Sequence, residues 1–457
     1  MSHISPAKRA VVIGAGISGL AAAQALADHF EQVVVLERDD VPSQATPRPG
    51  VPQGRHPHAL LSGGLRALCD LFPDFESTIA RAGARAGDCG LHLRFEFPGR
   101  EALPRRDLGV AFFMMTRPLL ELTMRQCVQE RKNVGLRSGC RVVDIAATPD
   151  GDSVASVSFM TREGELEVAP AHVVVDASGR GVPTLNFLKS AGRPVPEETV
   201  IGVDLGYSSA VYDIPAESQP DFKALATMPN APECSRSGLM QLREDGYWSV
   251  VLGGRGIDFP PADSKAFLAF ASGLETPTLY HAIQGATLRG EIIQYGFPES
   301  RRRHFERIGD FPRGLIPIGD SVCRFNPVYA QGMSVAVQEA VVLRNLVTRQ
   351  ATQDGTFATL GQEFLCAIQP LIRSAWALSA LPDLAYPHAR GERPADLEKA
   401  LEHQAVLNRA ACRDPDAHKL LFEVLHLIKP VSALHSRDVI RKVTGSRGPM
   451  LEVPLVA

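Results

Sequence analysis

Hydrophobic and polar positions at the start of the chain follow the order of a strand, a turn, a helix and a second strand. Ala10–Ile13 and Val33–Leu36 are short apolar runs rich in β-branched residues, and the apolar segment between them has the length of a helix. Gly14, Gly16 and Gly19 form G-x-G-x-x-G where the first strand meets that helix. The pattern predicts a Rossmann-like βαβ unit.

The glycine turn and the end of the second strand predict a dinucleotide site. Gly14 permits the tight turn, Gly16 lets a pyrophosphate approach the backbone, and Gly19 lets the helix pack on the strand. The amino end of the helix offers free N–H groups to the phosphates. Glu37 follows about 20 residues later, where a carboxylate binds a ribose and repels a 2′-phosphate. We therefore expect FAD or NAD rather than NADP, with Glu37 and the adjacent Arg38 at the cofactor.

Later segments alternate in the way of strands that are buried on one face. Leu91–Phe97 has apolar residues at every second position, and residues 142–175 contain short β runs broken by P-D-G-D and R-E-G-E. This series ends in a strand that enters a second glycine turn at 176–181. Residues 200–300 alternate again. We expect a meander of hairpins followed by an antiparallel sheet.

Helical patterns occupy much of the rest. Residues 116–130 favour a helix with Thr116 as its N-cap. From Thr356 to about Val443 the pattern is helical, apart from the Pro-containing segment 381–394.

Residues 315–347, LIPIGDSVCRFNPVYAQGMSVAVQEAVVLRNLV, combine a strand, a loop and a helix. Gly319, Asp320, Pro327 and Gly332 stand between the apolar run and the helix. An acidic residue after a strand, a Pro-bounded loop and the free amino end of a long helix suit the binding of a ligand. By itself, an Asp in this position is more often an N-cap or turn residue.

Composition and charge narrow the classes of protein. The chain has 457 residues, enough for two or three domains, and is 45% hydrophobic and 22% charged. A net charge of -3 gives no electrostatic case for nucleic acid. The eight cysteines lack C-x-x-C spacing, which favours reduced thiols in a cytoplasmic protein and no metal site. We expect no signal peptide and no membrane span, because the best apolar run, Val335–Val347, carries Gln338, Glu339 and Arg344.

Three separated segments resemble the class A flavoprotein monooxygenases, which share the p-hydroxybenzoate-hydroxylase fold. The segments are VVIGAGISGLAAAQAL with VVVLERD, then HVVVDASGRG, and then LIPIGDSVCRFNPVYAQGMSVA. Within that family the chain is most similar to polyene epoxidases of polyether-antibiotic pathways, on GVPQGRHPHALLSGG, DASGRG, FNPVYAQGMS and AWALSALPDLAYP. The resemblance implies FAD as the cofactor and a flavin C4a-hydroperoxide as the oxygen donor.

The elements and the resemblance together predict an α/β fold. It would contain a Rossmann-like FAD-binding domain, an antiparallel-sheet substrate domain and a C-terminal helical region. We expect the FAD-binding domain at residues 1–80, 105–195 and 301–350, the substrate domain at 81–104 and 196–300, and the helical region at 351–457.

The resemblance assigns cofactor roles to four residues. Gly319 and Asp320 match the family's G-D motif, in which the Asp binds ribityl or ribose hydroxyls of FAD. Arg117 matches an arginine on the helix that crosses the FAD. Arg55 matches a loop position near the isoalloxazine, and a solvated loop charge is an equally good interpretation of it.

The resemblance also implies a loop at the flavin edge, which is the candidate catalytic element. Pro327 would set the loop that overhangs the ring. Gln331, Gly332 and Met333 match the helix amino end, whose N–H groups stabilise negative charge on the reduced flavin. No catalytic side chain is identified.

Ser178 departs from hydroxylases that bind NADPH themselves, which usually carry Asp-Gly at the second glycine turn. The turn here is Asp-Ala-Ser-Gly-Arg at 176–180, and D-A-S-G also occurs in flavin halogenases and epoxidases. We expect NAD(P)H as the electron source, either directly or through a flavin reductase as partner.

Few side chains indicate acid–base catalysis. His56 and His58 flank a proline, while His281 and His304 stand alone, so we expect structural roles for all four. The lack of an evident base for phenol activation is compatible with epoxidation of an alkene.

An arginine run and three aromatic residues are candidates for contact with the substrate. The run Arg301–Arg303 is expected to be solvated surface, or alternatively to meet a substrate carboxylate. Tyr247, Trp248 and Phe259 in the predicted sheet suit an apolar small-molecule substrate.

Three functions remain open. The leading one is an FAD-dependent monooxygenase that epoxidises, or hydroxylates, an apolar polyketide or terpenoid in natural-product biosynthesis. The second is a flavin-dependent halogenase, although W-x-W-x-I-P is absent and GYWSVVLGG does not supply it. The third is an FAD-binding reductase or a non-catalytic flavoprotein. Oxygen turnover separates the first from the third, and halide dependence separates the first from the second.

Overall fold

Five parallel strands form a sheet in the order β17-β11-β1-β2-β7. They belong to a computed structural model that describes residues 8–99, 102–353 and 356–436. The strands are β1 (Arg9–Ile13), β2 (Gln32–Leu36), β7 (Val134–Arg137), β11 (Val173–Asp176) and β17 (Leu315–Pro317). Because β1, β11 and β17 are buried along nearly their whole length, they read as continuous apolar runs, as strands of parallel sheets do. The sheet confirms the predicted Rossmann-like unit.

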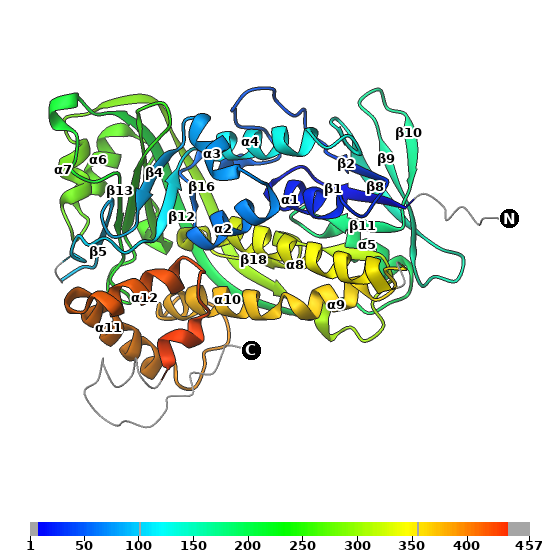
Figure 1. Ribbon diagram of the computed structural model, residues 1–457. Coiled ribbons are helices and arrows are strands. Elements are labelled where there is room, and N and C mark those ends of the chain that lie inside the picture. The colour runs from blue at the N-terminus through cyan, green and yellow to red at the C-terminus, as the bar shows by residue number, and fades with distance from the viewer. Residues whose placement is uncertain (1–7, 100–101, 354–355, 437–457) are drawn as a thin grey trace.

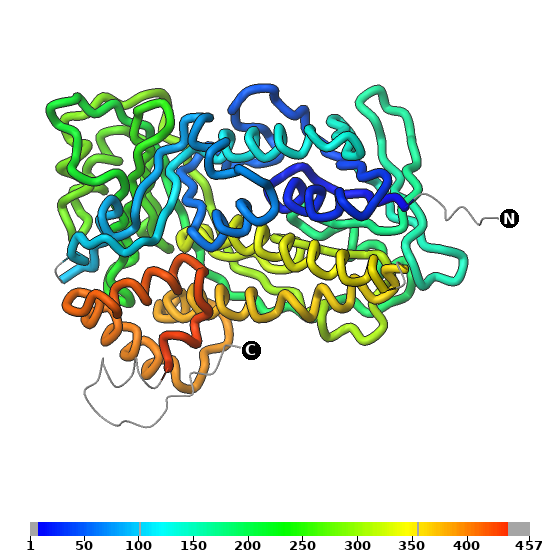
Figure 2. The backbone as a smooth tube through the Cα atoms, viewed as in Figure 1, coloured from blue at the N-terminus to red at the C-terminus, as the bar shows by residue number. Residues whose placement is uncertain are grey.

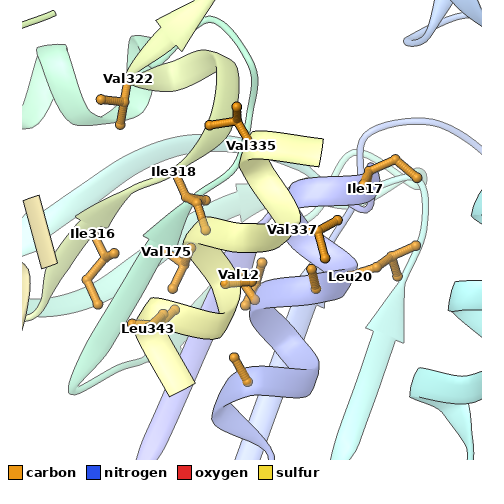
Figure 3. Close-up of a cluster of buried hydrophobic side chains, with 14 of the residues drawn as sticks. Val12, Ile17, Leu20, Val175, Ile316, Ile318, Val322, Val335, Val337 and Leu343 are labelled. Atoms are coloured by element: carbon orange, nitrogen blue, oxygen red, sulfur yellow. The ribbon is translucent and has the colours of Figure 1, made fainter. Parts of the chain in front are cut away.

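Two helices pack together against this sheet: α1 (Ile17–Leu26), which follows the glycine turn, and α8 (Gly332–Gln353). Figure 3 shows apolar side chains of both helices and of the central strands converging on one core. Fully buried members of this core are Val12, Leu20, Val175, Ile316, Ile318, Val337 and Leu343. The shared core places the amino ends of α1 and α8 beside each other at the edge of one cavity.

Two other segments flank the parallel sheet. The predicted meander is confirmed as an antiparallel sheet of β8 (Arg141–Ala147), β9 (Val154–Met160) and β10 (Leu166–Pro170). Helix α4 (Arg117–Gln129) begins after Thr116, whose side chain accepts a hydrogen bond from the N–H of Leu119 at 3.4 Å. The predicted N-cap is therefore confirmed.

The second large unit is a seven-stranded sheet in the order β18-β16-β12-β15-β14-β13-β5. All neighbouring strands are antiparallel except β5 and β13. One face packs on α6 (Ser264–Ser272) and α7 (Thr278–Ile283). The strands are β5 (Leu93–Glu96), β12 (Glu198–Asp213), β13 (Ala224–Thr227), β14 (Ser237–Leu242), β15 (Trp248–Arg255), β16 (Thr287–Arg303) and β18 (Cys323–Arg324).

A small fourth sheet has three strands. It pairs β6 (Ala111–Met114) with β3 (Ala59–Leu60) and β4 (Arg85–Asp88). Further helices are α2 (Ser62–Leu71), α3 (Phe75–Arg81) and α5 (Val182–Ser190).

The C-terminal region is helical, as expected, with α9 (Leu360–Ala367), α10 (Gln369–Leu384), α11 (Leu397–Arg413) and α12 (Pro415–Leu425). Figures 1 and 2 show it, from yellow-orange to red, along the lower side of the molecule. The break expected from residue 381 begins later, because α10 continues through Pro382. The expectation of helix up to Val443 falls partly outside the described residues, since 437–457 are not described.

Among the described residues, Leu360–Leu384 is long and apolar enough to cross a membrane. The sequence alone indicated Val335–Val347 as the best apolar run and did not identify this stretch. It comprises α9 and α10 and is interrupted between them. Since 67% of its apolar window is buried inside the protein, the stretch has the character of a core helix pair.

Candidate functional site

One cavity of about 610 Å³ lies between the parallel sheet and one face of the seven-stranded sheet. Its wall includes the glycine turn after β1, the end of β2, the turns after β11 and β17, and the amino end of α8. The opposite wall comes from β12 to β16. Ligands of open α/β sheets bind outside the carboxyl ends of the strands, so this cavity is the candidate site.

The glycine turn presents bare backbone at one end of the cavity. A Cβ on Gly14 would lie 2.7 Å from the carbonyl oxygen of Ala177, and a Cβ on Gly19 would lie 1.9 Å from that of Gly14. These two glycines therefore serve the packing of the turn. A Cβ on Gly16 would meet nothing closer than Nη2 of Arg48 at 3.9 Å. Gly16 thus keeps space open for a ligand.

Glu37 lies at the end of β2 with a buried carboxylate that faces the glycine turn. Its Oε2 accepts a hydrogen bond from the N–H of Ala15 at 2.7 Å, and its Oε1 accepts one from the N–H of Asp39 at 3.0 Å. Nη1 of Arg48 lies 3.0 Å from Oε2. Because Glu37 also lines the cavity, its position allows the predicted ribose contact.

Arg48 belongs to this end of the cavity but has no local signal in the sequence. It stands in a Pro- and Gly-rich loop, yet its guanidinium is buried in ion pairs with Glu37, Asp39 and Glu121. Arg117, at the start of α4, shares Glu121 at 2.8 Å and lines the cavity. Only the folded chain brings this loop residue to the turn.

The turn after β17 presents Asp320 to the cavity. The turn is a short 3-10 segment (η5, Gly319–Ser321), and Gly319 has φ +64°, which L side chains rarely adopt. Burial raises the pKa of the Asp320 carboxyl, while Arg117 and Arg324 oppose that rise. A carboxylate with a cavity-facing side is free to accept hydroxyl donors, as predicted for a ribityl chain.

Glu339 supports this turn from the buried side of α8, a role that the sequence reading missed. Its Oε2 accepts a hydrogen bond from the N–H of Gly319 at 2.7 Å. Its Oε1 has no hydrogen-bond partner in the described part of the chain. Burial raises the pKa of Glu339 to about 8; the Gly319 hydrogen bond lowers it and the Asp320 carboxylate raises it further. The carboxyl therefore carries its proton at pH 7.

The predicted flavin-edge loop closes one side of the cavity. Pro327–Tyr329 form a single 3-10 turn (η6), Ala330 follows with φ +55°, and α8 begins at Gly332. Gln331 is 2% exposed and its Oε1 lacks a hydrogen-bond partner among the described residues. Pro327, Gln331, Gly332 and Met333 all line the cavity, so the free N–H groups of the first turn of α8 lie at its wall.

The wall across from this loop follows from the two-residue period of strands. Tyr207 of β12 pairs with Tyr295 of β16, and both line the cavity together with Phe297, two residues further along. Leu239 of β14 pairs with Val251 of β15, and both also line it. The open face of the sheet is therefore largely aromatic and aliphatic.

The expectation that Tyr247, Trp248 and Phe259 face the substrate is wrong. Trp248 is buried on the opposite face against α6 and α7, because it lies three residues from Val251 and side chains alternate along a strand. Phe259 follows β15 and is 45% exposed, and Tyr247 precedes the strand. The site is apolar, as expected, but Tyr207, Tyr295 and Phe297 line it instead of these three residues.

His56 and His58 line the cavity, although the sequence reading expected structural roles. Nδ1 of His56 lies 2.7 Å from Oγ of Ser209, and its ring packs edge-on against Tyr207. Burial lowers the pKa of His56 to about 4. Burial, together with the charge of Arg117, lowers the pKa of His58 to about 3. Both rings are therefore neutral at pH 7.

The structure treats the two other predicted arginines differently. Arg38 lines the outer end of the cavity with a mostly exposed side chain. Arg55 ends a 3-10 turn (Pro52–Arg55), its side chain is exposed, and it is not among the residues that line the cavity. The structure does not bring Arg55 to the site.

Two residues of the run Arg301–Arg303 are buried, so the expectation of solvated surface is wrong for Arg302 and Arg303. Arg302 and Arg303 are 4% and 9% exposed. Nη1 of Arg303 donates to the carbonyl oxygen of Ser321 at 2.8 Å, directly after Asp320. Arg303 therefore supports the turn that carries Asp320.

The second glycine turn is held by Asp176. Its Oδ2 accepts hydrogen bonds from the N–H and the hydroxyl of Thr184 at 3.0 and 2.7 Å, and its Oδ1 accepts one from the N–H of Ser178 at 3.0 Å. Oγ of Ser178 accepts from the N–H of Gly181 at 3.2 Å. Ser178 thus takes part in the turn at the cavity wall.

These groups fit FAD. The open backbone at Gly16 and the helix amino end suit a pyrophosphate, and the carboxylates of Glu37 and Asp320 suit hydroxyls at two separate places. At the other end of the cavity, the loop before α8 carries the buried Oε1 of Gln331, which has no hydrogen-bond partner among the residues that the structure describes.

Comparisons with known proteins agree with this fit. The chain is 31% identical to protein Rv3254 of Mycobacterium tuberculosis (strain ATCC 25618 / H37Rv) over 406 residues, which are 85% of this chain and 82% of the relative. The chain belongs to the family of Rv3254. Residues 9–100 match the family model described as FAD dependent oxidoreductase. This member of the Rv3254 family therefore contains an FAD-dependent oxidoreductase domain.

Solved structures share the fold over most of its length. The structure of the flavin-dependent brominase Bmp2 superposes on this chain with a TM-score of 0.66 and 14% sequence identity. The superposition covers 91% of this chain and 92% of the brominase. The structure of 2-methyl-3-hydroxypyridine-5-carboxylic acid oxygenase superposes with a TM-score of 0.59 and 17% sequence identity, over 83% of this chain and 91% of the oxygenase. At these identities the likeness establishes the fold alone.

Proposed function

We propose that this protein is an FAD-dependent monooxygenase that epoxidises an alkene of an apolar polyketide or terpenoid in natural-product biosynthesis. The observation that carries the proposal is the continuity of one cavity. It reaches from the dinucleotide turn at Gly16 to the aromatic and aliphatic face around Tyr207, Tyr295 and Phe297. A cofactor bound at the turn would share this space with an apolar substrate.

Each part of the wall has a task in this reaction. The backbone at Gly16 and the amino end of α1 bind the pyrophosphate, Glu37 binds the ribose, and Asp320 orients the ribityl chain. The N–H groups of Gln331–Met333 stabilise negative charge at the edge of the reduced flavin. Bound reduced flavin supplies the electrons that activate molecular oxygen.

The apolar wall orients the alkene and keeps water away from the reacting atoms. Tyr207, Tyr295 and Phe297 provide this surface from paired strands. Alkene epoxidation needs no base on the substrate. Burial lowers the pKa of His56 to about 4, so this imidazole, which lies 2.7 Å from Oγ of Ser209, is neutral within the wall. NAD(P)H serves as the electron source, directly or through a flavin reductase.

Incubation of the protein with a trisubstituted polyene, FAD, a reducing system and ¹⁸O-labelled oxygen gas tests the proposal. Mass spectrometry should find one labelled atom in an epoxide, whether or not chloride or bromide is present. Catalase in the assay removes free peroxide, so that product depends on the enzyme-bound cofactor. A halogenated product would assign the protein to the halogenases, and flavin reduction without oxygen incorporation would assign it to the reductases.

A further inference from the structure

A buried carboxylate outside the cavity joins three parts of the chain. Asp383 lies in the last turn of α10 and is 1% exposed. Its Oδ1 accepts hydrogen bonds from Nη2 of Arg255 at 2.5 Å, Nδ2 of Asn326 at 2.9 Å and the hydroxyl of Tyr329 at 2.9 Å. One side chain of the C-terminal region therefore contacts both β15 and the loop before α8.

The contacts with the loop fall on its two ends. Asn326 precedes the 3-10 turn Pro327–Tyr329, and Tyr329 is the last residue of that turn. Oδ1 of Asn326 accepts a hydrogen bond from the N–H of Val328 at 3.1 Å, and Nδ2 of the same amide donates to Asp383. The side chain of Asn326 therefore links the turn to Asp383. Asp383 thus holds the residue that precedes the turn and the last residue of the turn, just before Ala330 and the amino end of α8.

The position of this acid is unfavourable without its partners. A negative charge in the last turn of a helix opposes the helix dipole, and a buried carboxylate requires a paired cation and hydrogen-bond donors. Arg255 supplies the cation, buried and stacked on the ring of Tyr386 at 4.5 Å. The acid is therefore stable only when the C-terminal helices, the substrate sheet and the loop are all in place.

We propose that Asp383 is a positioning residue, through which the C-terminal helical region fixes the flavin-edge loop against the cavity. It does not line the cavity and acts through Asn326 and Tyr329. The inference rests on the FAD site of the proposed function, since this loop carries Pro327 and Gln331 to the cavity wall. It assigns a task to a region that the oxidoreductase family model, at residues 9–100, does not reach.

Amide hydrogen exchange in the FAD-free protein tests the proposal directly. The N–H groups of Val328, Tyr329 and Ala330 all donate within the turn, so their exchange reports its order. In Asp383→Asn and Tyr329→Phe we expect at least tenfold faster exchange over residues 326–331. Peptides from the parallel sheet should stay protected to the wild-type degree.

A matched control comes from another link of the same region. Arg390 forms an ion pair with Asp204 of β12, and both side chains of this pair are exposed. Asp204 has φ +43°, which Asn tolerates well, so Asp204→Asn weakens the link without backbone strain. Exchange over residues 326–331 should be unchanged in this variant.

Measurements on the loaded protein separate this inference from the proposed function. With FAD bound, Tyr329→Phe should alter the visible flavin spectrum and raise the share of oxygen released as hydrogen peroxide at least twofold, while Asp204→Asn should not. Wild-type loop exchange in Tyr329→Phe, with the protein folded, would overturn the inference even if epoxidation is confirmed. Accelerated loop exchange in a protein that epoxidises nothing would uphold it and reject the proposed function alone. Tyr329→Phe removes a single hydroxyl, so it keeps the test valid if Asp383→Asn fails to fold.

Discussion

The N–H of Gly319 donates a hydrogen bond to the buried carboxyl of Glu339 at 2.7 Å, so α8 holds the turn that aims Asp320 into the cavity. The two residues are 20 positions apart, and the helix that carries Glu339 begins at Gly332, which lines the cavity. One helix therefore positions both Asp320 and the N–H groups of residues 331–333 at the cavity wall.

Glu339 should make stability depend on pH. Because the folded chain keeps its proton up to about pH 8 while the unfolded chain releases it near 4.5, the free energy of unfolding should fall as pH rises between these values. From pH 6 to 8 this fall is about 2 kcal/mol. Glu339→Gln should abolish it in urea titrations of the FAD-free protein and keep the bond to Gly319. Glu339→Ala should cost about 1–3 kcal/mol, since the Gly319 N–H loses its partner. An unchanged pH slope in Glu339→Gln would contradict the assignment.

Gly16 and Gly19 should respond differently to alanine. The added Cβ of Gly16→Ala finds open space, so thermal unfolding of the FAD-free protein should match the wild type while FAD affinity falls at least tenfold. Gly19→Ala would place its Cβ 1.9 Å from a backbone oxygen and should destabilise the fold itself. Calorimetry and FAD titration of both variants check the pair. Normal FAD binding by Gly16→Ala would remove the pyrophosphate from this turn.

Gly332→Val should raise peroxide release while FAD stays bound. A Cβ at Gly332 meets only Oδ1 of Asp320, at an ordinary 3.7 Å, so the protein accommodates it, whereas the methyl groups beyond it disturb the wall at the flavin edge. Gly285→Val is the control, because no atom lies within 4 Å of its added Cβ. Oxygen and peroxide electrodes give the ratio, and equal ratios in the two variants would refute the role of this loop.

Ser178 should limit direct use of NADPH. It occupies the turn position where hydroxylases that bind NADPH carry an acid, and its hydroxyl accepts from the Gly181 N–H. In anaerobic stopped-flow mixing, NADPH alone should reduce the flavin slowly, and addition of substrate or a flavin reductase should accelerate the reduction. Rapid reduction of the substrate-free protein would rule this out. Dithionite serves as the control that the flavin itself is reducible.

The C-terminal helices should contain one of the acid-sensitive positions of the fold. His418 on α12 is buried without a hydrogen-bond partner among the described residues, and burial lowers its pKa to about 4. Because the unfolded chain binds this proton near pH 6.5, stability should be complete above that value and decline toward pH 4. His418→Leu should reduce the loss between pH 7 and pH 4.5 by about 2 kcal/mol, and the exposed His281→Leu should not. Denaturant titrations from pH 7 to 4.5 measure both.

The sequence by itself determined the elements whose signals are local. The β-branched runs around Gly14, Gly16 and Gly19 predict the βαβ unit because strand and helix periods are written in neighbouring residues. The same holds for Thr116 as an N-cap and for the alternation of the second sheet. The turn at Asp320 and the helix start at Gly332 could also be placed along the chain.

Only the tertiary structure decided which residues face the cavity and what holds them. Trp248 and Val251 lie on opposite faces of one strand. The alternation does not say which face meets the cavity; that is decided by α6 and α7, which cover the face of Trp248 and leave Val251 at the cavity. Arg48 joins Glu37, and Asp383 joins Asn326, across 11 and 57 positions of chain. Such pairs have no period to detect, because the atoms meet only after separate helices and sheets have packed.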